Sequence, residues 1–504
     1  MEARLRTTLV INLTAIFEWA DLVILPAMYD NVSRAFDDAS PRQMGQLSTA
    51  RGVVQALSSP IGGALGHFND RISIIVAGCV IWGVMTMVFG TLSSLALATL
   101  VWSLNGFGQS LVIPNSQSII ADYYPAKARG RAFGTIYFTQ SVGEILGSLY
   151  AVSLGSRQVG PVDGWRFVMF TFAIFSALTA FANWAFARDP RAFASPPGRE
   201  GVEMGEIGET TVDETPIDEG DGESNKDADD GVGGKVEEDS REGGKDGENG
   251  PARAARVRSE ELLGMFWSVL KIPTFCIIIL QGVVGSMPWK GLMGFFILYF
   301  QLMGMTDVQA WQAYSAFLVG TAFGGLLGGW VGDAAAKISP DHGRILACQF
   351  SVLSGLPLTA ILFRWMPSNA APATVAGYVL ICFVYGLLIS WAAPACNNPI
   401  FAEIVPAERR SVIYAFDRCL ENAIASLANM WVGAASEVYG FQGGASRSGD
   451  PQKDAENSRA LGMAMLVFSV VPWSLCFLFY MGLHYTYPRD KSRVASRYTA
   501  LAAS

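Results

Sequence analysis

The sequence has little charge and few of the residues that carry enzyme chemistry. Asp, Glu, Lys and Arg make up 16% of its 504 residues, whereas an ordinary soluble domain has about 25%. Its three histidines, His67, His342 and His484, stand far apart. No nucleophile motif, phosphate-binding loop or metal-ligand spacing occurs. We therefore expect no enzymatic activity, no cofactor and no metal site.

Paired cysteines are also missing. The seven cysteines all fall inside apolar runs, and none has the spacing of metal ligands: Cys79, Cys276, Cys348, Cys382, Cys396, Cys419 and Cys476. Cysteines in such surroundings behave as small apolar side chains. The sequence therefore predicts neither a disulfide framework nor a zinc site.

Long apolar runs are what the sequence does contain, since 51% of its residues are hydrophobic. A run of about 18 residues is long enough to cross a ~30 Å hydrocarbon core as a helix. Twelve such helices would leave a water-soluble protein too little polar surface. The sequence therefore predicts an all-α membrane protein with transmembrane helices near 8–29, 44–66, 72–92, 95–121, 131–153, 165–187, 274–300, 310–332, 345–363, 371–400, 411–435 and 461–484.

One segment breaks this pattern. Residues 201–250 contain 18 acidic and 4 basic residues, and such a composition cannot bury enough apolar surface to offset its chain entropy. We expect an acidic, disordered linker between two six-helix bundles. The predicted domains are an N-terminal bundle over 1–190, the linker over 191–260, a C-terminal bundle over 261–488 and a tail over 489–504.

Basic residues gather in alternate loops. Lys and Arg are frequent before the first span, in the loops after spans two, four, eight and ten, on both flanks of the linker and in the tail. Short cytoplasmic loops of membrane proteins carry this excess of positive charge. We therefore expect both termini and the linker in the cytosol. The pattern does not distinguish the plasma membrane from an endolysosomal or vacuolar membrane.

Two motifs occur once in each half of the chain. "ADYYPAKARGRAFG" (121–134) aligns without a gap with "AEIVPAERRSVIYA" (402–415), so that Asp122 corresponds to Glu403 and Arg129 to Arg410. The segments 58–70 and 321–333 both place small residues at a spacing of four, Gly62 and Gly325 among them, and end in an acidic residue. We expect the small residues to share one helix face, where a neighbouring helix can approach closely. Repeated six-helix units joined by a polar linker are typical of transporters whose site lies between the two halves.

These motifs carry a resemblance to a known family. "GHFNDRIS", from Gly66 to Ser73, resembles the Gly-x-x-x-Asp-Arg loop of the major facilitator superfamily, and residues 121–134 resemble its turn between helices four and five. The segments "INLTAIFEWADLVILPAMYDNV" and "VGSMPWKGLMGFFILYFQLMGMTD" look like a Spinster-like plant and algal branch. The resemblance implies two pseudo-symmetric bundles that alternate access to a central site, and, at a distance, lysophospholipid or sphingoid-lipid substrates.

Charged residues inside the predicted spans are the first candidates for a functional site. A charge at the bilayer centre costs about 3 kcal/mol on insertion scales, so its retention suggests a role. We expect Glu18 first and Glu421 second to take up a proton or face the substrate. Arg51 and Lys290 would hold an anionic group or neutralise these acids. The remaining candidates for substrate or proton binding are Asp21, Gln140, Glu144, Asn397, Asn398 and Asp417.

Each of these candidates has a plainer interpretation. Asp21 and Arg51 are at similar heights on adjacent helices and could form a fixed structural pair. Glu18 and Glu421 could be static hydrogen-bond partners, Glu144 could serve helix packing, and Asp417 could have a gate or structural duty. The amides of Asn397 and Asn398 could join helices, which is the commoner use of such residues.

A second group of charged residues is expected to form a cytosolic gate between the halves. The resemblance implies this role, and the repeat supports it. The alternative is that these residues set topology alone. The group consists of Asp70, Arg71, Asp122, Arg129, Arg131, Asp333, Glu403, Arg409 and Arg410.

Two functions remain open. The first is a secondary transporter that moves a small organic solute or an amphiphilic lipid by alternating access, with protons as the driving ion. The second is a non-transporting membrane sensor or interaction protein with the acidic linker as its docking segment. The expected partners are the lipid bilayer, the substrate, protons and a cytosolic protein at the linker, and no nucleic acid.

Overall fold

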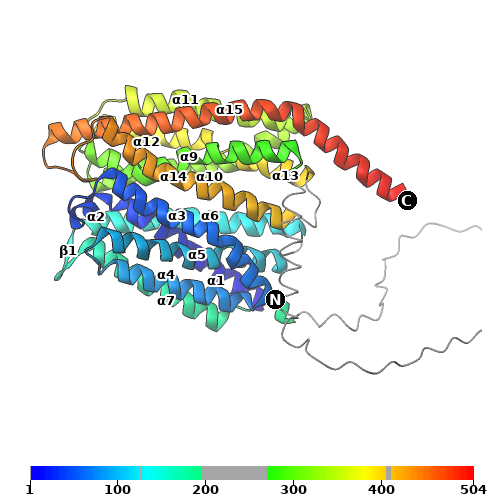
Figure 1. The fold of residues 1–504 in the computed structure, drawn as a ribbon, viewed down its shortest axis with the longest axis horizontal. Coiled ribbons are helices and arrows are strands. Elements are labelled where there is room, and N and C mark those ends of the chain that lie inside the picture. Colours follow the sequence, from blue (N-terminus) through cyan, green and yellow to red (C-terminus); the bar gives the residue numbers. More distant parts are fainter. Residues whose placement is uncertain (1, 125, 194–269, 405–409, 504) are drawn as a thin grey trace, which may run out of the picture. The chain divides into compact units, whose positions relative to one another are not determined.

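The computed structural model describes residues 2–124, 126–193, 270–404 and 410–503, and nearly all of them are helical (Figure 1). Residues 194–260 of the predicted linker lie outside the described residues. The N-terminal half contains α1 (Glu2–Ala27), α2 (Tyr29–Ala35), α3 (Pro41–Phe68), α4 (Arg71–Phe89), α5 (Leu95–Tyr123), α6 (Ala126–Gly155), the antiparallel strands β1 (Gln158–Val159) and β2 (Val162–Asp163), α7 (Gly164–Phe186) and the 3₁₀ turn η1 (Pro190–Phe193).

The C-terminal half has the same number of long helices. It contains α9 (Pro273–Leu302), α10 (Asp307–Ile338), α11 (Gly343–Ala360), the π-helical turn η2 (Ile361–Trp365), α12 (Pro372–Ile389), a second π-helical turn η3 (Ala393–Asn397), α13 (Asn398–Ile404), α14 (Arg410–Val438) and α15 (Pro451–Ala503).

The predicted spans coincide with twelve long helices in the described part of the chain. Nine stretches there are long and apolar enough to cross a membrane. The other three spans fall on α3, α6 and α14, which have 28, 30 and 29 residues but a more polar composition. These three helices carry Arg51, Glu144 and Glu421. The least apolar helices are therefore among those that hold the candidate site residues.

Local sequence signals explain where several helices begin. α3 starts with a capping box, in which Ser40 accepts from the Gln43 amide while the Gln43 side chain accepts from the Ser40 amide. α10 starts with the same device, built from Thr306 and Gln309. Such boxes satisfy backbone donors that the helix leaves unpaired. Because α3 and α10 hold the same place in their halves, the shared cap extends the internal repeat.

Small residues let helices approach closely, but one predicted face is wrong. On α3, a Cβ atom at Gly62 would overlap the carbonyl oxygen of Ser110 on α5, as expected. On α10, the predicted face containing Gly325 meets open space. The adjacent Gly324 packs instead, because a Cβ there would overlap the Ser390 hydroxyl oxygen. Consecutive glycines offer two small faces, and the sequence does not select between them.

The chain breaks where span ten contains two prolines. α12 ends at Ile389, and η3 then contains Pro394 and is followed by Pro399 in α13. Proline removes a backbone donor and clashes with the preceding turn, and π-helical turns of this kind often occur at functional sites. The break places Asn397 and Asn398 at a local widening of the helix.

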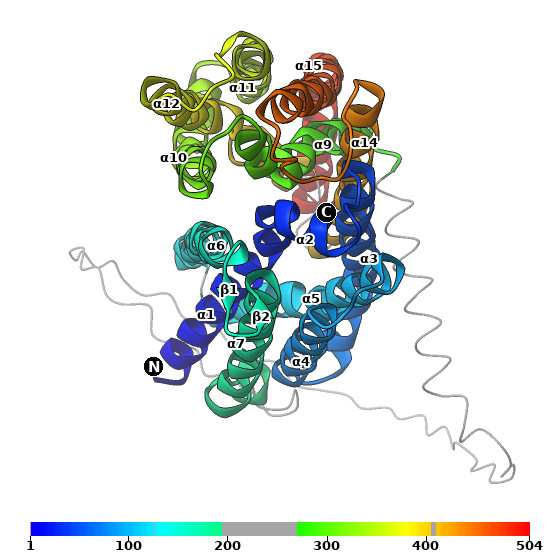
Figure 2. The same cartoon turned by 90° about the vertical axis from the view of Figure 1, so that its left-hand side faces the viewer.

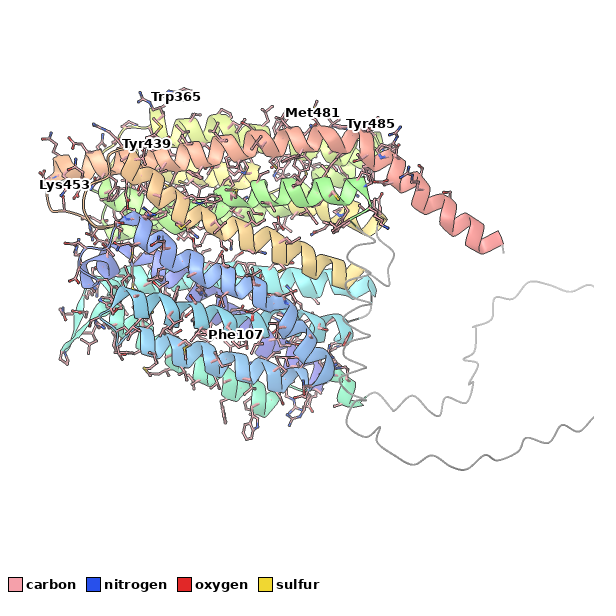
Figure 3. All side chains as sticks on the ribbon, viewed as in Figure 1. Phe107, Trp365, Tyr439, Lys453, Met481 and Tyr485 are labelled. Atoms are coloured by element: carbon pink, nitrogen blue, oxygen red, sulfur yellow. The ribbon has the colours of Figure 1, made fainter. Side chains whose placement is uncertain are left out.

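The ends of the helices define two faces of the bundle. α1 begins and α15 ends at the same face, which we call the terminal face (Figure 1). Figure 2 shows the bundle from its opposite end. Tyr439 and Lys453 lie at the opposite end, whereas Tyr485 lies towards the terminal face (Figure 3). We call the end near Tyr439 the far face.

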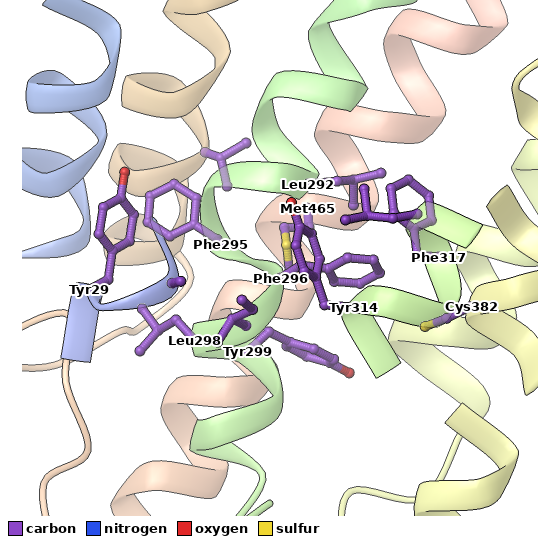
Figure 4. Packing of buried hydrophobic residues seen from close by; sticks show 14 of the residues in the cluster. Tyr29, Leu292, Phe295, Phe296, Leu298, Tyr299, Tyr314, Phe317, Cys382 and Met465 are labelled. Atoms are coloured by element: carbon purple, nitrogen blue, oxygen red, sulfur yellow. The ribbon is translucent and has the colours of Figure 1, made fainter. Parts of the chain in front are cut away.

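The buried core continues across the boundary between the halves. Tyr29 of α2 and Phe295 of α9 pack with ring centroids 5.4 Å apart, and both are buried (Figure 4). From Phe295 the cluster continues through Phe296 to Phe317 of α10, whose rings meet edge to face at 5.5 Å. Aromatic packing thus joins the two halves near the candidate site.

Candidate substrate and proton site

A buried ion pair links α1 to α3. The Arg51 guanidinium donates to Asp21 Oδ2 at 3.1 Å, and both side chains are almost fully buried. Gln109 Nε2 also donates to Asp21 Oδ2 at 2.9 Å, and Arg51 donates to the side-chain oxygens of Asn105 and Gln109 at 2.8 and 2.6 Å. Since each charge has several partners, this network holds three helices in register.

The other face of the Arg51 guanidinium lies over an aromatic ring. Its Cζ atom is 5.1 Å from the centroid of the Trp102 ring on α5, within the range of a cation–π contact. Hydrogen bonds and this ring contact together fix Arg51 in one orientation. The orientation of the Arg51 guanidinium is therefore fixed by its contacts within the protein.

Glu18 is held much less firmly than Asp21. It lies on α1 and is 5% exposed, within electrostatic reach of Arg51 and Asp21. Its carboxylate makes no hydrogen bond to any residue in the described part of the chain. A buried carboxyl group without such partners can gain or lose a proton without breaking a hydrogen-bond network.

A cavity of about 70 Å³ lies between the halves. On the same measure one water molecule needs about 10–15 Å³, so several waters or a small polar group fit inside. Helices α1, α3 and α5 of the N-terminal half and α9 and α14 of the C-terminal half contribute its walls. Its lining residues are Leu22, Val23, Pro26, Ser48, Arg51, Gly52, Gln55, Trp102, Lys290, Met293, Gly294, Ser426 and Asn429.

Two carboxylates lie within electrostatic reach of Lys290, one from each half. Glu144 on α6 is 5% exposed, and its Oε1 has no hydrogen-bond partner in the described residues. Glu421 on α14 is 9% exposed and accepts a hydrogen bond from Ser286 at 2.8 Å. Lys290 interacts electrostatically with both. A single lysine is therefore attracted by one acid from each half.

Glu421 also lines a smaller polar pocket within the C-terminal half. This pocket measures about 30 Å³ and is shared with Gln281, Asn397 and Asn398. The Tyr480 hydroxyl donates to Asn397 Oδ1 at 3.0 Å. The structure therefore brings together Glu421 and the two amides of the broken helix, but it places them in a different pocket from Arg51 and Lys290.

Contacts between the halves concentrate at the far face. Arg447, between α14 and α15, donates to Asp30 of α2 from its backbone amide at 2.6 Å and from its guanidinium at 2.9 Å. The same guanidinium lies 3.1 Å from Asp307 at the start of α10. Burial lowers the pKa of Arg447, but the two carboxylates outweigh burial and raise it, so Arg447 stays charged. We call Asp30, Arg447 and Asp307 the far-face clamp.

Further bonds reinforce the clamp. The Ala445 amide donates to the Ala39 carbonyl at 2.8 Å, and the Arg42 amide donates to Glu437 at 3.2 Å. Deeper in the bundle, the Thr49 hydroxyl donates to the Ser426 carbonyl at 2.7 Å. The ion pair of Arg447 with Asp30, which joins the halves, belongs to the same end of the bundle. The structure is therefore closed at the far face.

At the terminal face, the described gate residues of the N-terminal half contact residues of the same half. Arg71 donates to Asp122 at 2.7 Å and to Asp189 at 2.6 Å. Asp70 caps α4 by accepting from the Ser73 amide at 2.8 Å. These contacts stay within one half, so here they brace its helices and do not bridge the halves.

The described gate residues of the C-terminal half also pair within their own half, but through two separate basic residues. Asp333 accepts from Arg344 at 2.7 Å, and Glu403 lies 3.3 Å from Lys491. The side chains of the other gate candidates Arg129, Arg131, Arg409 and Arg410, and that of Asp417, lie outside the described residues. Gln140 is buried in α6. Among the described residues, no cluster of three or more His, Cys, Asp or Glu could hold a metal ion.

Sequence reasoning missed the far-face clamp and Asp189. Asp30, Asp307 and Arg447 lie outside the apolar runs and look like ordinary surface charges. Asp189 directly follows span six, where the topology argument uses only the neighbouring basic residues. A buried acid cannot be told from an exposed one by composition, so only pairing the two halves in space could have found these residues.

Comparison of the sequence with known protein families identifies one family whose model matches most of the chain. The family model of the Major Facilitator Superfamily matches residues 8–429. The chain belongs to the major facilitator superfamily. Its twelve long helices in two repeated halves are the architecture that this membership requires.

Solved structures of major facilitator proteins have the same fold. A bacterial homologue of the human lysosomal transporter Spinster, in an inward-facing and unoccupied conformation, superposes with a TM-score of 0.71 at 18% identity, covering 97% of this chain and 98% of that one. The nucleoside transporter NupG gives 0.60 at 13% identity over 96% and 100%. A D-xylose–proton symporter also gives 0.60, at 14% identity over 94% and 97%.

A curated relative shares part of the sequence. The cis,cis-muconate transport protein of Acinetobacter baylyi is 25% identical over 181 residues, which are 36% of this chain and 42% of that protein. The match thus spans less than half of the relative's length. It supports the family assignment and leaves the substrate to be argued from the site.

Proposed function

We propose that this major facilitator protein is a secondary active transporter that moves a small organic solute or an amphiphilic lipid by alternating access, driven by protons. The observation that carries the proposal is the cavity between the halves, which is lined by Arg51 of α3 and Lys290 of α9. A charge is costly inside a membrane and is retained where it serves a function. Both halves contribute to the cavity, so their relative movement would change which side it faces.

Glu18 is the proposed proton carrier, and Glu421 is the second candidate. Asp21 is tied to Arg51 and two amides, whereas Glu18 lies one helical turn away without a hydrogen bond in the described part. A proton carrier must change its charge during each cycle. The loosely held acid suits this requirement better than the firmly held one.

Alternating access would use the charges at the two faces. With the termini in the cytosol, the far-face clamp closes the outer side, and the braced pairs around Arg71 and Asp333 belong to an open inner side. The Spinster homologue with the same fold was solved in an inward-facing conformation, which supports this interpretation. Gating by exchange of such contacts is a rigid-body movement of one repeat against the other.

An uptake assay would test this function. Purified protein in proteoliposomes with an acidic exterior would be offered a nucleoside, D-xylose and cis,cis-muconate, which the names of the relatives give, and a lysophospholipid, which the Spinster resemblance implies. We expect uptake of at least one, at a rate that falls at least tenfold in Glu18→Gln when the pH gradient drives it. Exchange of internal for external substrate needs no net proton movement and should persist.

The exposed Glu456 provides the control. Glu456→Gln removes a carboxylate at the far face and should leave uptake unchanged. Equal gradient-driven uptake by Glu18→Gln and the wild type would reject Glu18 as the proton carrier. A wild type that moves none of the probes in either direction would reject transport of these classes and favour the sensor interpretation.

A further inference from the structure

The charged residues that line the cavity between the halves all have the same sign. Its thirteen lining residues include two cations, Arg51 and Lys290, and no carboxylate. Leu22, Val23 and Met293 are among the apolar residues on its walls. A cavity of this composition favours a ligand with a negative group and an apolar body.

Only one of the two cations is available to a ligand. Arg51 is occupied by Asp21, Asn105 and Gln109. Lys290 makes no hydrogen bond or ion pair to the described residues, and its carboxylate neighbours act on it only through their charge. An ammonium group has three donors, so Lys290 enters the cavity with its binding capacity unused.

Close packing of α9 against α14 places a second polar group beside Lys290. Gly294 follows Lys290 by four residues and therefore lies on the same helix face. A Cβ atom at Gly294 would overlap Asn429 Oδ1, so glycine is needed there. Asn429 is 7% exposed, and its Oδ1 has no partner in the described residues. The Asn429 carboxamide therefore lines the cavity with Lys290 without a hydrogen bond to the described residues.

We propose that this cavity binds an anionic group of the substrate, a carboxylate or a phosphate, through Lys290 and Asn429. This inference rests on the proposed transport function and names its substrate class. The ammonium group of Lys290 pairs with the anion, and the apolar wall contacts the rest of the molecule. The Asn429 side chain lines the same cavity and offers its Nδ2 group as a second donor to the anion. Arg51 adds positive potential without leaving its own partners.

Glu144 is the competing partner of Lys290. It lies across the boundary between the halves and has an unpaired buried oxygen among the described residues. When the substrate is absent, Glu144 is the acid from the opposite half that attracts Lys290, and a bound anion takes its place. When a bound anion replaces Glu144 as the partner of Lys290, the attraction between the two halves becomes weaker. Substrate binding is thereby coupled to the contact between the halves.

Ligand binding to the purified full-length chain in nanodiscs would test the proposal. The probes are cis,cis-muconate as a free organic acid, lysophosphatidic acid as a lipid phosphate, inorganic phosphate, and the neutral D-xylose and uridine. Thermal stability is measured against the concentration of each probe. We expect one anionic probe to stabilise the wild type and to bind at least tenfold more weakly to Lys290→Gln, while Lys290→Arg retains most of the affinity.

Matched variants separate this outcome from a general loss of folding or charge. Lys337→Gln removes an exposed lysine and should bind like the wild type, while Glu144→Gln should bind the anion at least as tightly because it removes the competitor. The stabilising probe tells whether the anion is a free acid or a lipid headgroup. Unchanged affinity in Lys290→Gln, or stabilisation by neutral probes alone, would overturn the inference while leaving transport intact.

Discussion

Asp21 and Arg51 differ from the neighbouring charges Glu18 and Lys290 in how many hydrogen bonds they make. Both are saturated by hydrogen bonds, whereas Glu18 and Lys290 on the adjacent turns and helices make none to the described residues. A saturated pair fixes geometry, and an unsaturated charge can change its partner. We therefore propose that Glu18 and Lys290, which have fewer contacts, are the residues that change partner during transport.

Breaking the Asp21–Arg51 pair should destabilise the protein. In Arg51→Met, Asp21 remains as a buried, uncompensated charge, which costs about 3–5 kcal/mol of unfolding free energy. The double variant Arg51→Met with Asp21→Asn should recover most of this loss, because no charge is left unpaired. Unfolding in denaturant, followed in detergent micelles, measures both. Lys337→Met is the surface control, and a single variant as stable as the wild type would show that the pair is not structural.

The connection between α14 and α15 is an element whose importance the sequence hides. Residues 439–450 contain glycines and polar side chains and resemble an ordinary loop. In the structure they supply Arg447 to the clamp and Ala445 to a backbone bond with Ala39. The loop thus joins the C-terminal half to α2, the short helix that continues from α1.

Loss of the clamp should open the far face. Arg447→Gln leaves Asp30 with fewer partners, which costs about 1–3 kcal/mol and shifts the equilibrium away from the closed arrangement. A cysteine at Ser48, in a variant whose seven native cysteines are replaced, would report on this. We expect a membrane-impermeant thiol reagent added outside to label it several-fold faster in Arg447→Gln.

Arg459→Gln is the matched control, since Arg459 is exposed and lies outside the clamp. Equal labelling rates with and without Arg447 would mean that the clamp does not hold the far face closed. Faster labelling in both arginine variants would point to a general loss of charge at this face instead.

The helices and their repeat could be predicted from the length of the apolar runs and from the recurring motifs. Apolar runs fix the twelve helices, and the motifs at Asp70 and Asp333 reveal the repeat. The packing face of α10 could not be predicted, because Gly324 and Gly325 are equally small. Partners such as Asp30 and Arg447, separated by 417 residues, could not be predicted either, because their meeting depends on how the two halves dock.

At the scale of the whole molecule, the acidic segment differs from the helical halves in its composition and charge. The two halves share one compact unit, and their contacts come from helices and short connections. The segment 201–250 carries a net charge of −14 while the rest of the chain carries +6. We propose that this segment directs the protein to its membrane or binds a partner, and that it does not take part in transport.

Deletion of residues 201–250 should therefore leave transport within about twofold of the wild type. The remaining 26 residues between Phe193 and Leu270 can reach up to about 85 Å when extended, so the halves need not be strained. Uptake in proteoliposomes and the cellular location of a tagged chain are measured together. A Gly/Ser segment of equal length is the control for the loss of charge, and abolished uptake in both variants would assign the segment a part in transport.

α15 continues for 53 residues, from Pro451 to Ala503, which corresponds to about 80 Å at 1.5 Å per residue. Its last contacts with the bundle include Lys491 beside Glu403, and beyond this point the helix projects (Figure 1). A projecting helix of this length magnifies angular change. A fluorophore near residue 500, paired with another at the start of α1, would convert a small rotation of one bundle into a large change in energy transfer, so single molecules could be watched through each turnover.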